Sequence, residues 1–161
     1  MKCFECGSEM VEKRETVRDH ALGLPNVVLR EVPVRRCPKC REYEVVFPQM
    51  ARLHKFLAGI LIRKNTRLTG HEVRFLRKYL GWSGADLARR IGVTPESVSR
   101  WENEHEPIGL VPDRTLRLMV ALEKPVDNYH ASALEIITAD DPKPAALNVA
   151  VKDSGYVLVD A

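Results

Sequence analysis

The sequence lacks any apolar run long enough to cross a membrane as a helix. Its first residues, Met1 to Cys6, also lack the apolar segment of a secretory leader, so we expect a cytoplasmic protein with no membrane partner. It has no glycine-rich phosphate loop and no paired catalytic carboxylates, and its five histidines form no triad with a nucleophile. We therefore expect no enzymatic activity.

Cysteine is scarce, but the four that occur form two regular pairs, Cys3-x-x-Cys6 and Cys37-x-x-Cys40. In a reducing compartment this pattern is more typical of a metal site than of disulfides. Each pair can form a tight turn whose two thiolates hold one side of a tetrahedral ion. We predict one structural Zn²⁺ per chain, because four thiolates leave no open position for a substrate. Iron in the same thiolate site is the electron-transfer alternative, and redox disulfides are a weaker one.

The residues between the cysteine pairs alternate as in strands over 12–18 and 27–35, with a turn at 20–26 marked by Gly23 and Pro25. Pro33 interrupts the second strand, which predicts an edge position. Such a sheet has too little core to fold without the ion, whose binding contributes about 10 to 16 kcal/mol to folding. These residues indicate a zinc ribbon.

From Pro48 the apolar residues recur at spacings of three and four, which predicts a connecting helix that ends near residue 64. Its apolar stripe is a core face or a dimer seam, and core is the more common of the two. A polar linker follows, so we place a domain boundary near residue 66.

Three cap signals then open three closely spaced helices: Thr69 with Glu72, Ser83 with Asp86, and Thr94 before Pro95. Gly92 begins a three-residue turn between the last two helices. A further helix starts at Pro112, with its predicted apolar side formed by Leu116, Leu118, Met119 and Leu122. Two helices joined by so short a turn form a helix-turn-helix, in which the second helix enters the major groove of DNA.

Charge is distributed unevenly along the chain. Residues 1–124 hold 23 Lys/Arg against 16 Asp/Glu, whereas residues 125–161 hold 2 against 6. The basic excess is greatest over 52–117, with 13 basic and 7 acidic residues. This excess suits a polyanionic partner, and a solvated charged surface is the alternative.

The acidic C-terminal stretch carries two apolar runs, 147–151 and 156–159, on either side of Lys152 to Gly155. This pattern predicts a hairpin, and a disordered acidic tail is the alternative. A lone hairpin is marginal in water, so an ordered one needs a partner, which is the body of the chain, the other protomer or a toxin. Our hypothesis is that it adds a dimer or toxin contact.

The residues Ser83, Leu87-Ala88, Gly92 to Thr94 and Val98 to Glu102 resemble the signature of the phage-repressor-like (Xre) helix-turn-helix family. Preceded by cysteine pairs in this order and spacing, they resemble the MqsA (YgiT-type zinc finger) antitoxins of bacterial toxin-antitoxin systems. The resemblance covers about residues 1 to 122. It implies a ribbon that binds a toxin and a helix-turn-helix domain that dimerises on operator DNA and represses its own operon.

In such proteins the start of the recognition helix and its next turn read the bases, which here means Pro95, Glu96 and Arg100. Arg100 can grip a guanine, or can pair with Glu96 one turn earlier. Relatives carry an amide where this chain has Glu96, so the operator sequence does not follow from theirs. They often carry a glycine where it has Glu104. Candidate phosphate contacts, with helix capping as the equal alternative for the hydroxyl residues, are Ser83, Gly84, Thr94, Ser97 and Ser99.

The sequence therefore predicts an α+β protein: a small N-terminal zinc-ribbon β domain with its connecting helix (1–66), an all-α helix-turn-helix domain (67–124) and an acidic extension with a β-hairpin (125–161). The resemblance to the MqsA antitoxins implies a dimeric DNA-binding repressor that acts as the antitoxin of a cognate toxin. A solitary zinc-ribbon regulator without a toxin is the main alternative.

Overall fold

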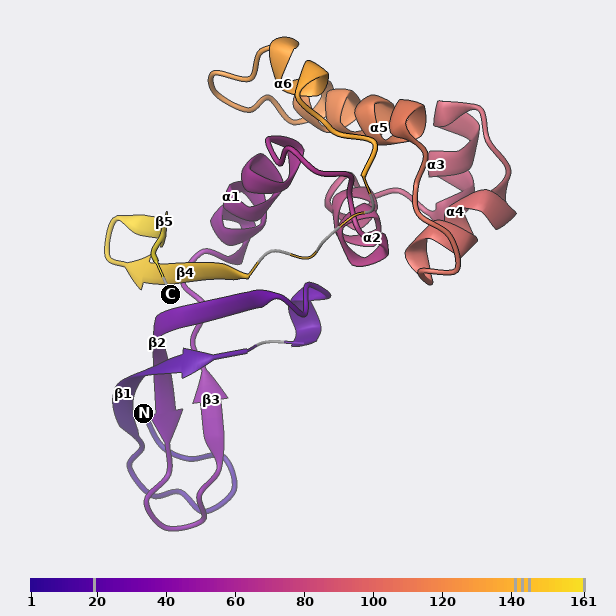
Figure 1. Cartoon of the computed structure of the whole chain (residues 1–161). Coiled ribbons are helices and arrows are strands. Elements are labelled where there is room, and N and C mark those ends of the chain that lie inside the picture. The colour runs from indigo at the N-terminus through magenta and orange to yellow at the C-terminus, as the bar shows by residue number, and fades with distance from the viewer. Residues whose placement is uncertain (19, 141, 143, 145, 161) are drawn as a thin grey trace. The chain divides into compact units, whose positions relative to one another are not determined.

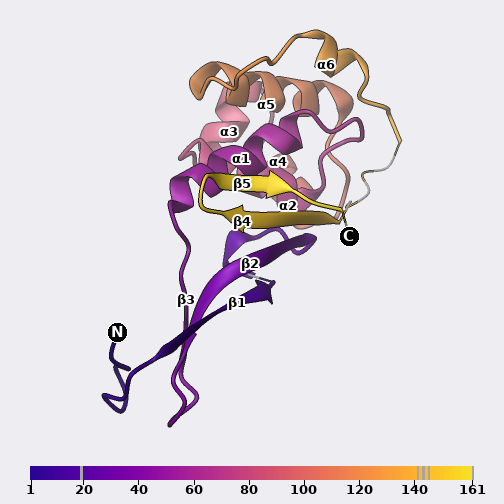
Figure 2. The same cartoon turned by 90° about the vertical axis from the view of Figure 1, so that its left-hand side faces the viewer.

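The computed structural model describes residues 1–18, 20–140, 142, 144 and 146–160, and Figures 1 and 2 show it from two sides. Backbone contacts divide these residues into two compact units. The sheet unit combines 1–18, 26–53 and 146–160, and the helical unit combines 20–25 with the described part of 54–144. This division differs from the sequential boundaries at 66 and 124 expected from the sequence, because the last strands join the first unit.

The sheet unit is built around β2, which pairs with three other strands. The sheet has the order β1-β2-β4-β5, and β3 also pairs with β2. β2 runs antiparallel to β1 and β3 and parallel to β4. The five strands are β1 (Val11–Val17), β2 (Val27–Arg36), β3 (Tyr43–Val45), β4 (Leu147–Lys152) and β5 (Gly155–Leu158). The two strands predicted between the cysteine pairs are thus confirmed.

Pro33 lies in this central strand, so the edge position predicted for it is wrong. On one side of β2 the pairing with β4 ends at Arg30, and the pairing with β3 begins at Val34. Pro33 faces Val46, just past the end of β3, and its carbonyl accepts the Val46 N–H at 2.9 Å. Proline cannot return this hydrogen bond, so the ladder between β2 and β3 ends at this position. Glu31, with a φ of +58°, marks the bend between the two halves of β2.

The C-terminal hairpin is ordered, so the disordered alternative is wrong. β4 lies beside β2 in both cartoons, and β5 returns antiparallel to β4 (Figures 1 and 2). Val149 and Val151 of β4 are buried. The Arg14 guanidinium donates to the carbonyl of Val151 at 3.3 Å and to the Asp153 carboxylate at 3.2 Å. The hairpin therefore pairs with the chain's own sheet. Our hypothesis had instead assigned it to a contact with a second protomer or a toxin.

The helices are α1 (Met50–Ile62), α2 (Gly70–Tyr79), α3 (Gly84–Ile91), α4 (Pro95–Glu102), α5 (Leu110–Glu123) and the short α6 (Ser132–Glu135), with a 3-10 turn at His20–Leu22. Three helices begin directly after the cap residues that the sequence marked, Thr69, Ser83 and Thr94, whereas α5 begins two residues before the predicted Pro112. The stripe of α1 is a core face, because Leu57, Ala58 and Leu61 are fully buried. None of the helices in the described ranges is long and apolar enough to cross a membrane.

The buried face of α5 agrees only in part with the one predicted: Leu116 is fully buried and Met119 is half-buried, as expected. Leu118 and Leu122, expected in the core, are 41% and 71% exposed. The buried face instead includes Asp113 and Arg117, whose carboxylate oxygen and Nε lie 2.6 Å apart. The prediction failed because this buried ion pair occupies positions that a hydrophobicity pattern assigns to solvent.

The Asp113–Arg117 pair also anchors the segment that precedes α2. Arg117 donates to the carbonyls of Lys64 and Thr66, and Asp113 accepts the N–H of Leu68 at 2.6 Å. Each polar atom of the buried pair is thereby given a partner, which buried charges require. The predicted linker is therefore a fixed part of the helical unit.

Candidate metal centre and nucleic-acid interface

The four cysteine sulfurs meet at one end of the sheet unit, within 4.8 Å of one another. The Sγ atoms of Cys3 and Cys40 are 3.5 Å apart, and those of Cys6 and Cys37 are 3.4 Å apart. A tetrahedral Zn²⁺ with Zn–S bonds of about 2.3 Å requires sulfurs about 3.8 Å apart. The four cysteines are therefore positioned to bind one metal ion, as the sequence predicted.

The two cysteine turns share one backbone geometry. In the first, the N–H of Gly7 donates to the carbonyl of Cys3 at 2.9 Å, and in the second the N–H of Arg41 donates to that of Cys37 at 3.1 Å. Gly7 has a φ of +69° and Arg41 a φ of +65°. Gly7 was singled out in the sequence for this conformation, whereas an arginine gives no such signal.

The pKa values of the thiols show why a cation suits this site. Hydrogen bonds from the hydroxyl and the amide of Ser8 lower the pKa of Cys6 to about 6. The amide of Glu42 lowers the pKa of Cys40, but the nearby thiols, Cys3 first, and burial outweigh it and raise this pKa to about 12. Sulfurs this close cannot all ionise without a compensating positive charge. Four thiolates suit zinc and iron alike, and their closed arrangement favours a structural role.

The helix-turn-helix geometry is set by two local features. Gly92 ends α3 in the left-handed conformation, with a φ of 74°. Two residues later Thr94 caps α4, its hydroxyl accepting the N–H of Ser97 at 3.2 Å. The three-residue turn predicted between the two helices is thus confirmed.

α4 has one packed face and one open face. Val98 and Trp101 are buried, as predicted for a packed side, whereas the side chains at the base-reading positions Pro95, Glu96 and Arg100 are exposed. Among the described residues, neither a hydrogen bond nor an ion pair joins the side chains of Glu96 and Arg100. The Arg100 guanidinium is therefore available to a ligand.

Glu102 fixes the C-terminal end of α4 from inside. Its carboxylate accepts from Arg77 at 2.5 and 2.8 Å and from Arg74 at 3.2 Å. Burial alone would raise the pKa of Glu102, but the hydrogen bonds and charges of Arg77 and Arg74 outweigh burial and lower it. These contacts join α4 to α2.

The predicted phosphate contacts lie at the starts of α3 and α4. Ser83 forms a capping box with Asp86: the serine hydroxyl accepts the Asp86 N–H at 3.1 Å, and the carboxylate accepts the Ser83 N–H at 3.0 Å. Thr94 and Ser97 form the cap described above, and the Ser99 hydroxyl accepts from Asn103 at 3.2 Å. Helix capping is therefore present at Ser83 and Thr94 but not at Ser99, and phosphate contact stays a prediction.

Comparison with known families identifies this region. Residues 73–110 match the helix-turn-helix family model. Comparisons with curated proteins and with solved structures gave no match. The matched helix-turn-helix runs from Val73 in α2 to Leu110, the first residue of α5. It supports a DNA-binding transcription regulator whose partner is double-stranded DNA.

The helix-turn-helix also contains basic residues that the sequence analysis did not single out. A hollow of about 430 Å³ lies between α2, α3 and α4. Its lining brings Gly84, Pro95 and Ser99, all predicted contacts, together with Arg74 and Lys78 of α2. The only sequence signal for these two residues was the general basic excess over 52–117.

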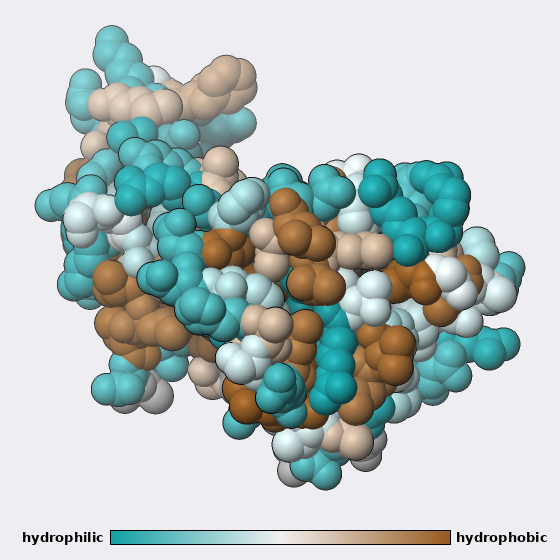
Figure 3. All heavy atoms as spheres, turned by 90° about the horizontal axis from the view of Figure 1, so that it is seen from above, coloured by the Kyte–Doolittle hydropathy of each residue, from teal (hydrophilic) through white to brown (hydrophobic). Residues whose placement is uncertain are grey.

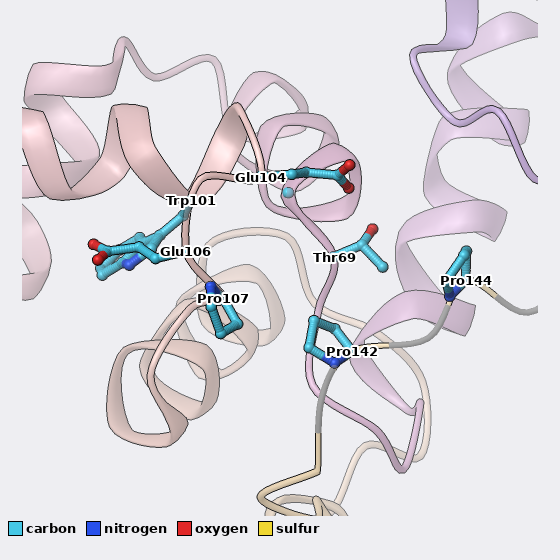
Figure 4. Close-up of a pocket in the computed structure, with 8 residues that line it drawn as sticks. Thr69, Trp101, Glu104, Glu106, Pro107, Pro142 and Pro144 are labelled. Atoms are coloured by element: carbon cyan, nitrogen blue, oxygen red, sulfur yellow. The ribbon is translucent and has the colours of Figure 1, made fainter.

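A second hollow is lined by acidic side chains, Glu104 and Glu106. It measures about 420 Å³ and is lined by Thr69, Gly70, Trp101, Glu104, Glu106, Pro107, Pro142 and Pro144 (Figure 4). Among the described residues that line it, two carry carboxylates and none is basic, and these carboxylates would repel phosphate. We therefore do not assign it to the DNA interface.

Proposed function

We propose that the chain is a transcriptional repressor of the antitoxin type. It binds operator DNA as a homodimer through its helix-turn-helix, carries one structural zinc ion in its ribbon, and neutralises a cognate toxin. This proposal assigns a binding role and no catalytic reaction. The geometry of α4 supports DNA binding most directly. Trp101 and Glu102 anchor its inner face, and the exposed Arg100 side chain on its outer face is available to a ligand.

Sequence recognition follows from the chemistry of the exposed face of α4. Arg100 can donate two hydrogen bonds to a guanine, a contact worth about 1 to 3 kcal/mol of discrimination. Glu96 can only accept, which suits the amino group of a cytosine. Arg74 and Lys78, at the edge of the neighbouring hollow, suit phosphates and fix the register without reading sequence.

Dimerisation is supported by the outer face of α5. Val111, Leu118 and Leu122 are 74%, 41% and 71% exposed, and Thr115 completes a stripe at spacings of four, three and four. Figure 3 looks onto the molecule from the side of α5 and α6 and shows brown, hydrophobic residues among teal ones. A second copy packed on this stripe would bury it and present two recognition helices to half-sites about 34 to 36 Å apart.

The antitoxin role rests on the resemblance to MqsA antitoxins, in which a ribbon precedes the helix-turn-helix. The test is a pull-down of the tagged chain from its native host, with inspection of the adjacent gene. We expect a small toxic protein, encoded next to this gene, to copurify. A chain that binds its own promoter but has neither a neighbouring toxin gene nor a copurifying protein is a solitary regulator instead.

DNA recognition is tested by Arg100→Ala, measured by fluorescence anisotropy on the promoter of the chain's own gene. We expect loss of specific binding, because the main base contact is removed, with an unchanged melting temperature, because the side chain is exposed. Arg18→Ala is the matched control, since it removes the same charge from an exposed site outside the matched segment. Equal affinity of Arg100→Ala and Arg18→Ala would contradict the proposed recognition.

A further inference from the structure

A small cavity lies in the helical unit between the 20–25 loop, α1 and α2. Its volume is about 140 Å³, and its walls include Leu22, His54, Arg74, Phe75, Lys78 and Tyr79. Among the described residues of the lining, Arg74 and Lys78 carry positive charges and none carries a carboxylate. The cavity is therefore suited to an anion.

The remaining wall is apolar and aromatic. Leu22 and Phe75 are each only 7% exposed, and the His54 ring meets the Phe75 ring edge-on at a centroid distance of 5.8 Å and an angle of 86°. Flat apolar groups pack well against such surfaces. The same cavity thus combines cationic groups with an aromatic wall.

Two polar groups of the lining have no partner within the described chain. Neither the Lys78 ammonium nor the His54 imidazole makes a hydrogen bond or an ion pair with another described residue. Burial lowers the pKa of His54, and the positive charge of Lys124 lowers it further. The imidazole is therefore neutral at pH 7 and offers one N–H. A carboxylate could accept from both groups.

We infer that this cavity binds a small organic monoacid with a flat apolar body, of the size of benzoate. The carboxylate is held by Lys78 and His54, and the body lies against Phe75 and Leu22. The volume is well below the roughly 300 to 1,000 Å³ of pockets for larger ligands, which excludes nucleotides. The role of this ligand rests on the proposed function: it is the effector that relieves repression.

Arg74 connects the cavity to the DNA-binding face. It lines both the cavity and the hollow between α2, α3 and α4. Its guanidinium donates to Glu102 at 3.2 Å and to Asn103 at 3.0 Å, at the C-terminal end of α4. A carboxylate in the cavity competes with these partners for Arg74 and neutralises the charge of Lys78. Both effects lower the affinity of the chain for DNA.

Benzoate is the probe for the first test, which uses the full chain without DNA and measures binding by saturation-transfer NMR. We expect the wild type to bind benzoate and His54→Gln to bind it about tenfold more weakly, because one hydrogen bond to a charged group is lost. His71→Gln is the matched control, since His71 lies on α2 outside the cavity lining and should bind as the wild type does.

Lys78→Gln provides a second variant in case His54→Gln folds poorly. It should also bind benzoate more weakly than the wild type does. Absence of benzoate binding by the wild type, or undiminished binding by both variants, overturns the site. Displacement of benzoate by inorganic phosphate at equal concentration contradicts the assignment to an organic acid, because phosphate has no apolar body.

The second test measures binding to the chain's own promoter over a range of benzoate concentrations. We expect saturating benzoate to weaken DNA binding about tenfold in the wild type and in His71→Gln, within the usual range of allosteric coupling, and His54→Gln to need about tenfold more benzoate for the same effect. Benzoate that binds without altering DNA affinity contradicts the effector role. Failure of the wild type to bind DNA at all contradicts the proposed function and with it the effector role, while the benzoate measurement still decides the cavity.

Discussion

Two sharp turns place charged residues where glycine is usually found. Arg41 closes the second cysteine turn with a φ of +65°, and Glu104 follows α4 with a φ of +58°. The left-handed conformation costs a residue with a Cβ about 1 to 2 kcal/mol. The resemblance led us to expect that Glu104 would alter the loop after α4, yet this residue takes the conformation that glycine adopts readily.

Glu104→Gly should therefore stabilise the helical unit by up to about 1 kcal/mol, because relief of the backbone strain exceeds the entropy that glycine adds to the unfolded chain. Urea unfolding followed by tryptophan fluorescence measures the change. Glu123→Gly, at the end of α5, is the control and should destabilise, since glycine is a poor helix former. A lower stability for Glu104→Gly would show that the turn is not strained.

At the scale of elements, the cysteine turns, the sheet and the helices depend on different forces. The helices begin at Thr69, Ser83 and Thr94 because each side chain satisfies a free backbone N–H, a local effect that a sequence reveals. The metal site was equally visible, since cysteine spacing alone defines it.

Purified protein should contain one zinc ion per chain by elemental analysis, and Cys37→Ser should abolish it, because a buried ligand of a closed site is lost. We expect the sheet unit of this variant to lose protection from hydrogen exchange. A red protein with stoichiometric iron would instead support the electron-transfer alternative.

The place of the C-terminal hairpin could not be predicted in this way. The two apolar runs indicated strands, but β4 joins β2 across more than a hundred residues, and no local signal specifies such a partner. The edge position expected for Pro33 failed for the same reason, because β4 and β3 share one side of β2. Long-range pairing decides both.

Val149→Asp tests the role of this hairpin in the sheet. Val149 is fully buried in β4, so an unpaired carboxylate there should destabilise the sheet unit by about 3 kcal/mol or more. Hydrogen exchange of the β2 amides at 27–30 measures it. Val157→Asp on β5 is the control, since Val157 is 39% exposed and should tolerate the change. Equal protection in both variants would mean that the hairpin does not stabilise β2.

At the scale of the whole molecule, the sequence indicated the α+β class and the outer residues of the recognition helix. It did not indicate Arg74 and Lys78 as part of the interface, because their position beside α4 depends on how α2 packs. It also misplaced Leu118 and Leu122 in the core, since the buried Asp113–Arg117 pair inverts the usual relation between polarity and burial. Packing between helices decides these features.

A footprint on the promoter of the chain's own gene tests the central claim most directly, because it reports operator binding and two-fold symmetry together. If a dimer presents two α4 helices, hydroxyl-radical cleavage should be suppressed in two segments of related sequence, centred about 34 to 36 Å apart or at a multiple of that distance. A single unpaired protected segment would contradict the dimer. Uniform cleavage at protein concentrations that saturate the site in the anisotropy experiment would contradict sequence-specific repression itself.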